Sequence, residues 1–233
     1  MKYLLKQFFE PESSTFTYFI IDRESNEAVI IDPVLETLER DVEYIKETGL
    51  KIKYILDTHV HADHITAAGK LREITGAKTV IGSGANVDCI DISINNHESL
   101  KLGKLEIVAI ATPGHTDSCT SYYVPRLNSV FTGDTLLIRG NGRTDFQQGD
   151  ASLLYDSIQK LFSLKEDTVV YPAHDYKGRN CTTIEEEKKY NPRIGNNKTK
   201  EEFIKIMDSL KLANPKKIQE ALPANLACGN KTN

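Results

Sequence analysis

A short stretch with three histidines and one aspartate constrains this chain more than any other feature. The string Thr58-His59-Val60-His61-Ala62-Asp63-His64 places four metal-capable side chains within six positions. The apolar residues 52–56 before it predict a short buried strand, and residues from about 65 to 75 have the spacing of an amphipathic helix. Because a turn between a strand and a helix can direct several side chains to one point, this stretch predicts a metal site.

Further metal-capable side chains follow apolar runs elsewhere in the chain. Proline or glycine accompanies each of them and favours a sharp turn. They are His115 after the run 105–111, Asp134 after the run 129–132, and His174 after the run 168–171. A single histidine is most often structural, but several residues at strand ends can converge on one sheet edge, and we expect these to do so. The sixth histidine, His97, lies in a polar loop and is expected on the surface.

The ligand types narrow the choice of metal. None of these turns contains a cysteine, and imidazole combined with carboxylate suits zinc, iron or manganese. Zinc would polarise a bound water for hydrolysis. Iron(II) held by two histidines and one carboxylate would leave positions open for a substrate and O₂. Residue types alone leave both reactions open.

Strands and helices are predicted to mix along the whole chain, which favours an α/β layered architecture. Gly49 is expected to end the first helix, and Asp150 is expected to cap the helix 151–164. The expected strands are 16–21, 28–31, 52–56, 78–81, 105–111, 121–124, 129–132 and 168–171, and the other expected helices are 35–48, 65–75 and 201–210.

Composition excludes several classes of protein. The net charge of -4 over 233 residues argues against a nucleic-acid binder, which usually has a basic excess. No apolar run approaches the roughly 20 residues of a membrane span. The first nine residues resemble neither a signal peptide nor a transit peptide, so a cytoplasmic location is expected.

The cysteines are expected to be free thiols, and several charged residues are expected to lie on the surface. The four cysteines form no CxxC pair, and free thiols in a reducing cytosol are expected for Cys89, Cys119, Cys181 and Cys228. The charged run 185–189 is expected to be a solvated surface segment. The same is expected of the cations Arg193, Lys198 and Lys205.

Taken together, the histidine motif, the turn 112–116, Gly133-Asp134 and His174 resemble the metallo-β-lactamase superfamily. This resemblance implies an αβ/βα sandwich, in which two mixed β-sheets face each other, helices flank them and metal binds at one edge. It also implies a single domain over residues 1–233, with a C-terminal helical extension from about 180.

Within that superfamily, the chain is similar to the persulfide dioxygenases, the sulfur dioxygenases related to the ethylmalonic encephalopathy protein. The strings that carry this likeness are 136–140, 142–149 (Gly-Arg-Thr-Asp-Phe-Gln-Gln-Gly), 171–176, 202–207 and 223–229. One position departs from the pattern, because Asn141 stands where many relatives have cysteine. A thiol role at that position is therefore in doubt, whereas the metal site is not.

The family resemblance implies a role for each matching residue. It implies one Fe(II) per chain, bound by His59, His115 and Asp134. It places four further residues outside the iron shell, where they orient the ligands or form a second metal site: His61, Asp63, His64 and His174. It also implies Tyr176 beside the iron, Arg143 and Asp145 in a polar network, and Cys228 near the substrate pocket.

The implied reaction joins a thiol persulfide with O₂ and water to give the thiol and sulfite, in sulfide detoxification. Glutathione persulfide is the usual substrate of the family, although the sequence leaves the carrier thiol open. Two alternatives remain. One is a binuclear zinc thioester hydrolase of the glyoxalase II type, because all seven ligand positions are present. The other is a non-catalytic metal-binding module. A homodimer is expected only from the general frequency of dimers.

Overall fold

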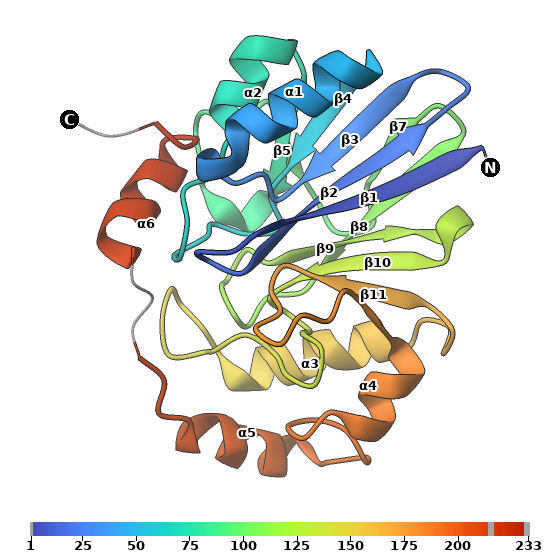
Figure 1. The fold of residues 1–233 in the computed structure, drawn as a ribbon. Coiled ribbons are helices and arrows are strands. Elements are labelled where there is room, and N and C mark those ends of the chain that lie inside the picture. Colours follow the sequence, from blue (N-terminus) through green and yellow to red (C-terminus); the bar gives the residue numbers. More distant parts are fainter. Residues whose placement is uncertain (1, 214–216, 231–233) are drawn as a thin grey trace.

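Two six-stranded sheets packed face to face form the centre of the computed structural model, which describes residues 2–213 and 217–230 (Figure 1). Both sheets contain parallel and antiparallel pairs. In the first sheet the strands follow chain order: β1 (Tyr3–Glu10), β2 (Thr15–Asp22), β3 (Glu27–Ile31), β4 (Lys51–Leu56), β5 (Lys78–Gly82) and β6 (Ile92–Ile94). The second sheet has the order β12-β11-β10-β9-β8-β7: β7 (Ser99–Leu102), β8 (Leu105–Ala111), β9 (Thr120–Val124), β10 (Ser129–Gly133), β11 (Val169–Pro172) and β12 (Thr182–Thr183).

Helices cover the outer faces of both sheets (Figure 1). The helices α1 (Leu38–Thr48) and α2 (Ala68–Thr75) lie on the first sheet, and α3 (Ala151–Phe162), α4 (Ile184–Tyr190) and α5 (Lys200–Ser209) lie on the side of the second. The last helix, α6 (Ile218–Leu226), lies beside the layers. Short 3₁₀ helices span Leu35–Thr37, Ser83–Ala85 and Pro125–Leu127. This layering confirms the expected αβ/βα sandwich.

The core is divided into layers because side chains alternate across each strand. On β2, Tyr18 packs with Phe131 of the second sheet, whereas the next residue, Phe19, packs with Tyr44 of α1. Every residue of β2 is buried, which requires cover on both faces of the strand. A third cluster fills the space between the second sheet and α3 and α5.

Local signals explain the ends of several helices. Gly49 adopts the left-handed conformation after α1, with a φ of 64°, as expected of a glycine that ends a helix. The Asp150 side chain accepts a hydrogen bond from the Leu153 backbone and caps α3, which confirms the prediction. In contrast, α2 begins at Ala68 and not near 65. The residue Thr66 forms a β-bridge with Val34, which keeps the chain extended at that point.

Three expectations about cysteines and charges were wrong. Cys89 and Cys228 form a disulfide, with an S–S distance of 2.01 Å, whereas Cys119 and Cys181 are free as expected. The run 185–189 is part of α4, with Glu185 and Lys189 exposed as expected, but its Glu187 is buried and pairs with Arg139. Arg193 is half-buried, not a solvated surface charge. Within 2–213 and 217–230, no helix is long and apolar enough to cross a membrane.

Candidate metal centre

Four loops bring the predicted ligands to one edge of the sandwich. The strands β8, β10 and β11 run in the same direction, because β8 and β10 are both antiparallel to β9 and β11 is parallel to β10. Their carboxyl ends therefore deliver His115, Asp134 and His174 to the same edge. The strand β4 of the first sheet delivers the loop 57–66 to this edge, and we call this segment the metal-binding loop.

The first group of ligands consists of His59, His115 and Asp134. One ligand atom from each side chain lies within 4.8 Å of the other two. Two imidazoles and one carboxylate arranged in this way match the facial set that binds non-haem iron(II). Asp134 Oδ1 is buried and accepts no hydrogen bond among the described residues, although His174 Nε2 lies 3.5 Å away, so it is available to coordinate a cation. The side chains therefore fit a bound metal ion.

Hydrogen bonds set which nitrogen each histidine presents. His115 Nδ1 lies 2.7 Å from the carbonyl oxygen of Arg143. Because a carbonyl can only accept, Nδ1 carries the proton and Nε2 is free to bind a metal. His59 Nδ1 lies 3.0 Å from Thr58 Oγ1, whose hydroxyl donates to Asp32. Burial, followed by the nearby rings of His61 and His115, holds the pKa of His59 well below its usual value, so the ring is neutral.

A second group lies directly beside the first. Ligand atoms of His61, Asp63 and His174 also lie within 4.8 Å of one another. His174 Nε2 is 3.5 Å from carboxylate oxygens of both Asp63 and Asp134, and His64 Nδ1 is 3.2 Å from Asp63. The structure therefore brings all four expected companion residues next to the triad.

Electrostatics favours a charged pair in the second group. Burial favours the neutral form of both His174 and Asp63. Even so, the carboxylates of Asp134 and Asp63 raise the pKa of His174. The rings of His174 and His64 hold the pKa of Asp63 well below its usual range. With no ion bound at the site, these directions favour an ion pair between His174 and Asp63.

Two buried carboxylates that sequence reasoning missed lie behind the ligands. Asp32 accepts hydrogen bonds from the Thr58 backbone at 2.7 Å and lies 3.2 Å from His61 Nε2. Asp57 accepts from the Thr66 hydroxyl at 2.9 Å. Burial, followed by the Asp32 carboxylate, raises the pKa of Asp57 to about 7. The sequence contained a signal for Asp32, because this aspartate directly follows the apolar run of β3, as the metal ligands follow theirs.

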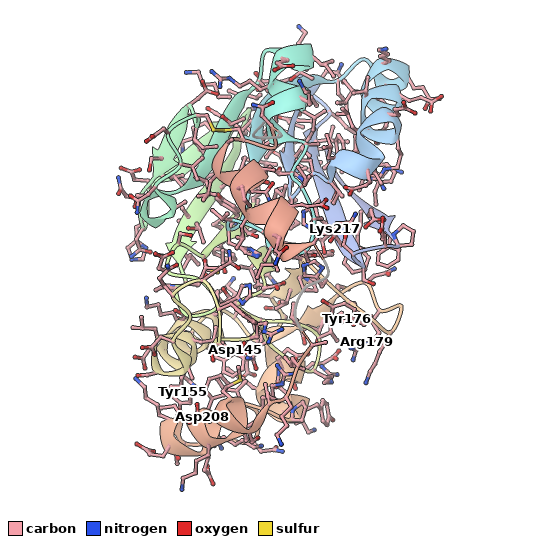
Figure 2. All side chains as sticks on the ribbon, turned by 90° about the vertical axis from the view of Figure 1, so that its left-hand side faces the viewer. Asp145, Tyr155, Tyr176, Arg179, Asp208 and Lys217 are labelled. Atoms are coloured by element: carbon pink, nitrogen blue, oxygen red, sulfur yellow. A yellow bond between two sulfur atoms is a disulfide. The ribbon has the colours of Figure 1, made fainter. Side chains whose placement is uncertain are left out.

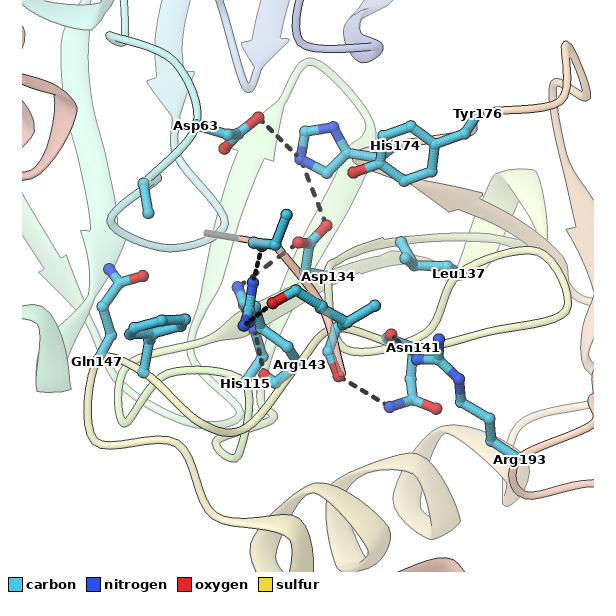
Figure 3. A pocket seen from close by; sticks show the side chains of 15 residues that line it. Asp63, His115, Asp134, Leu137, Asn141, Arg143, Gln147, His174, Tyr176 and Arg193 are labelled. Atoms are coloured by element: carbon cyan, nitrogen blue, oxygen red, sulfur yellow. Dashed lines mark hydrogen bonds and ion pairs between the residues drawn. The ribbon is translucent and has the colours of Figure 1, made fainter. Parts of the chain in front are cut away.

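A cavity of about 410 Å³ opens over the triad (Figure 3). Its inner end is lined by Asp63, His115, Asp134 and His174, and its outer part by Leu137, Asn141, Phe146, Arg193 and Leu212. The Tyr176 ring stacks on His174 with centroids 6.0 Å apart. Figure 3 shows its hydroxyl turned toward the cavity, and the place of Tyr176 beside a bound metal stays a prediction.

Arg143 and Asp145 form the expected polar network at the cavity wall. Arg143 Nε lies 2.6 Å from Asp145, and its Nη1 donates to the carbonyl of Ala213 at 2.6 Å. Its guanidinium also covers the ring of Phe146. The side chain of Arg143 therefore holds the cavity wall together, while its carbonyl orients His115.

The expected position of Cys228 near the substrate pocket is not what the structure shows. Among the described residues, Cys228 is not part of the cavity lining. Its sulfur is bonded to Cys89, and it lies beside His59 and His61 on the other side of the metal-binding loop, in a small space of about 10 Å³. A free thiol at Cys228 is therefore excluded while the disulfide is closed.

Comparisons with known proteins agree with this geometry. Residues 11–174 match the model of the metallo-beta-lactamase superfamily. The structure of ETHE1 from Myxococcus xanthus superposes with a TM-score of 0.93 at 50% identity, covering 97% of this chain and 100% of that one. The proteins "Persulfide dioxygenase ETHE1, mitochondrial" of Mus musculus and Homo sapiens are each 50% identical over 98% of this chain and 90% of their own length.

The chain belongs to the persulfide dioxygenase family. This persulfide dioxygenase combines the metallo-beta-lactamase fold with a cavity whose outer wall includes Asn141 and Arg193. The names of the mammalian relatives assign those proteins to mitochondria, and the cytoplasmic location of this chain stays a prediction.

Proposed function

We propose that this protein uses one iron(II) ion to convert glutathione persulfide, O₂ and water into glutathione and sulfite. Membership of the family makes it an oxidoreductase that acts on persulfides. The iron assignment is supported by one observation above the others, the convergence of His59, His115 and Asp134 at the inner end of the cavity. Iron bound there would supply a redox-active centre with positions open for the terminal sulfur and for O₂.

The chain's own residues hold and shield the reactants. Hydrogen bonds fix the rings of His59 and His115, so the ligand set is in place before substrate enters. The apolar side chains of Leu137, Phe146 and Leu212 line the outer cavity and exclude water from the persulfide. The Tyr176 hydroxyl, turned toward the cavity, is placed to donate a hydrogen bond to an anion at the inner end.

A cation in the outer cavity supports a carrier thiol that bears a carboxylate. Arg193 lines the cavity at the side opposite Asp63, and its Nη1 donates to the Asn141 carbonyl at 2.6 Å. A guanidinium has five donors in a planar fork that matches a carboxylate. Glutathione carries two carboxylates. Coenzyme A carries phosphates, which a guanidinium also matches, so the two carriers are separated by the turnover comparison and not by Arg193.

The test is O₂ uptake by the iron-loaded protein on addition of glutathione persulfide, with sulfite assayed in the same sample. One sulfite per O₂ consumed is expected, with slower turnover of coenzyme A persulfide. No uptake with any persulfide would contradict the proposal.

The second group of ligands favours one rival function, a binuclear zinc hydrolase. His61, Asp63 and His174 lie close enough to hold a second ion beside the triad. We expect His59→Ala, His115→Ala or Asp134→Ala to abolish iron binding, whereas His61→Ala and His174→Ala retain it. Two observations would support the zinc hydrolase: two zinc ions per chain that are lost together in His61→Ala, and hydrolysis of a glutathione thioester.

A further inference from the structure

The helix α6 is hydrogen-bonded to the metal-binding loop through the side chain of Asn225, and its Ala221 and Ala224 pack with Ile65 of the loop. Its Oδ1 accepts a hydrogen bond from the Thr66 backbone at 2.9 Å. Its Nδ2 donates to the carbonyls of His61 and His64, both at 2.8 Å. Asn225 is only 5% exposed. Both amide donors and the amide oxygen are therefore used on one loop.

These bonds matter because most of the metal-binding loop has no regular structure of its own. Between the end of β4 and the start of α2, the backbone of buried residues such as His61 and His64 must find partners outside a helix or sheet. Leaving a buried carbonyl unpaired costs about 1–3 kcal/mol. The two carbonyls held by Asn225 lie on either side of Asp63, so the side chain fixes the path of the chain that carries the ligands.

The position of α6 is fixed in turn by close backbone contacts. The Cys228 carbonyl accepts from the Gly69 backbone at 3.1 Å. A Cβ on Gly69 would lie 2.3 Å from that carbonyl oxygen, and one on Gly229 would lie 2.1 Å from the carbonyl oxygen of Thr66. The disulfide between Cys228 and Cys89 ties the segment that follows the C-terminal end of α6 to the rest of the chain. Figure 2 shows α6 on the side of the molecule that also carries Tyr176 and Asp145.

We propose that Asn225 is a positioning residue of the metal centre, which acts by holding the metal-binding loop in the conformation that presents its histidines. The proposal rests on the metal site of the proposed function, but not on which reaction that site catalyses. An asparagine suits the position because it supplies two donors and one acceptor at this short reach, whereas an aspartate keeps the acceptor and loses both donors.

The experiment compares Asn225→Asp and Asn225→Ala with a matched control, Asn128→Asp. Asn128 lies just before β10, at the opposite end of that strand from Asp134, where its Nδ2 donates to the Asp167 carbonyl and its Oδ1 accepts from Thr168. The control therefore loses a comparable side-chain-to-backbone bond far from the ligands. Three quantities are measured: the rate of iron(II) release to a chelator, the visible spectrum of the cobalt(II)-substituted protein, and the unfolding temperature.

At a temperature where all variants are folded, both Asn225 variants are expected to release iron at least tenfold faster than the parent and to shift the cobalt spectrum. Asn128→Asp is expected to lower the unfolding temperature while iron release and the spectrum stay unchanged. Parental release rates and spectra in the folded Asn225 variants would overturn the proposal. If the aspartate variant does not fold, the alanine variant decides, because it adds no buried charge. None of these readouts requires dioxygenase activity, so failure of the reaction assignment would be seen separately.

Discussion

At the scale of single residues, Gly142 shows how closely the ligands are packed. Its backbone nitrogen donates to the Asp134 carbonyl at 2.6 Å. A Cβ at this position would lie 2.6 Å from that oxygen and 2.7 Å from Cγ of the His115 ring. These distances are too short for any side chain, so two ligands would have to move.

We therefore expect Gly142→Ala to reduce the iron content of the purified protein several-fold. Gly140→Ala is the control, because a Cβ there would meet only Leu137, at 3.9 Å. Metal analysis of both variants checks the prediction. A full iron load in Gly142→Ala would show that the ligands can shift without losing the ion.

Arg193 is the residue whose proposed role concerns substrate binding alone. A charge-assisted hydrogen bond is worth about 1.5–3 kcal/mol, so Arg193→Met is expected to raise KM for glutathione persulfide roughly 10- to 100-fold. The value of kcat should change much less, because the residue lies away from the triad. Lys205→Met, which removes an exposed cation, is the control. Steady-state O₂ uptake measures both constants, and a loss confined to kcat would contradict the carboxylate role.

At the scale of elements, α1 carries a buried carboxylate whose ionisation opposes folding. Burial raises the pKa of Asp41 from 3.8 to about 6, although Arg40 lies 2.8 Å away and lowers it. The unfolded chain releases this proton near pH 4 and the folded chain near pH 6. The folded state therefore loses stability as the pH rises through this window.

Asp41→Asn mimics the protonated form and should remove this loss. Two pKa units correspond to about 3 kcal/mol, so the variant is expected to exceed the parent in free energy of unfolding by at most this amount above pH 7. Below pH 4 the two proteins should be equally stable. Urea titrations at both pH values check the difference, and a gap that persists at low pH would point to another cause.

The anchoring of α6 makes a second prediction at this scale. The disulfide joins residues separated by 139 positions. In the chain-entropy description, closing so long a loop stabilises the folded state by up to about 5 kcal/mol. Cys89→Ser, or addition of dithiothreitol, is expected to lower the urea midpoint markedly, whereas Cys181→Ser, which removes a free thiol, should not. An unchanged midpoint in the Cys89 variant would show that the bond contributes nothing.

At the scale of the whole molecule, the strand ends were the part that sequence could predict. Apolar runs mark β4, β8, β10 and β11, and a polar residue directly after a run is visible without a structure. Other features depend on contacts made only after folding. The edge strand β1 is half-buried and lacks a clean alternation. The helix α6 contains Pro223, and it buries the small residues Ala221 and Ala224 together with Asn225.

Contacts between residues far apart in the sequence could not be predicted from it either. Neither the disulfide between Cys89 and Cys228 nor the burial of Arg193 in the cavity wall follows from neighbours in the sequence. The role of Asn225 was missed for the same reason, because its partners lie more than 150 positions away.

The triad draws its ligands from both sheets, since His59 follows a strand of the first and His115 and Asp134 follow strands of the second. An ion bound by all three therefore cross-links the two halves of the sandwich at its open edge. A ligand that binds only the folded state stabilises it in proportion to the logarithm of its free concentration. With the proposed iron in this site, its supply during synthesis would affect the lifetime of each molecule against proteolysis as well as its activity, and iron-starved cells would contain less of the protein.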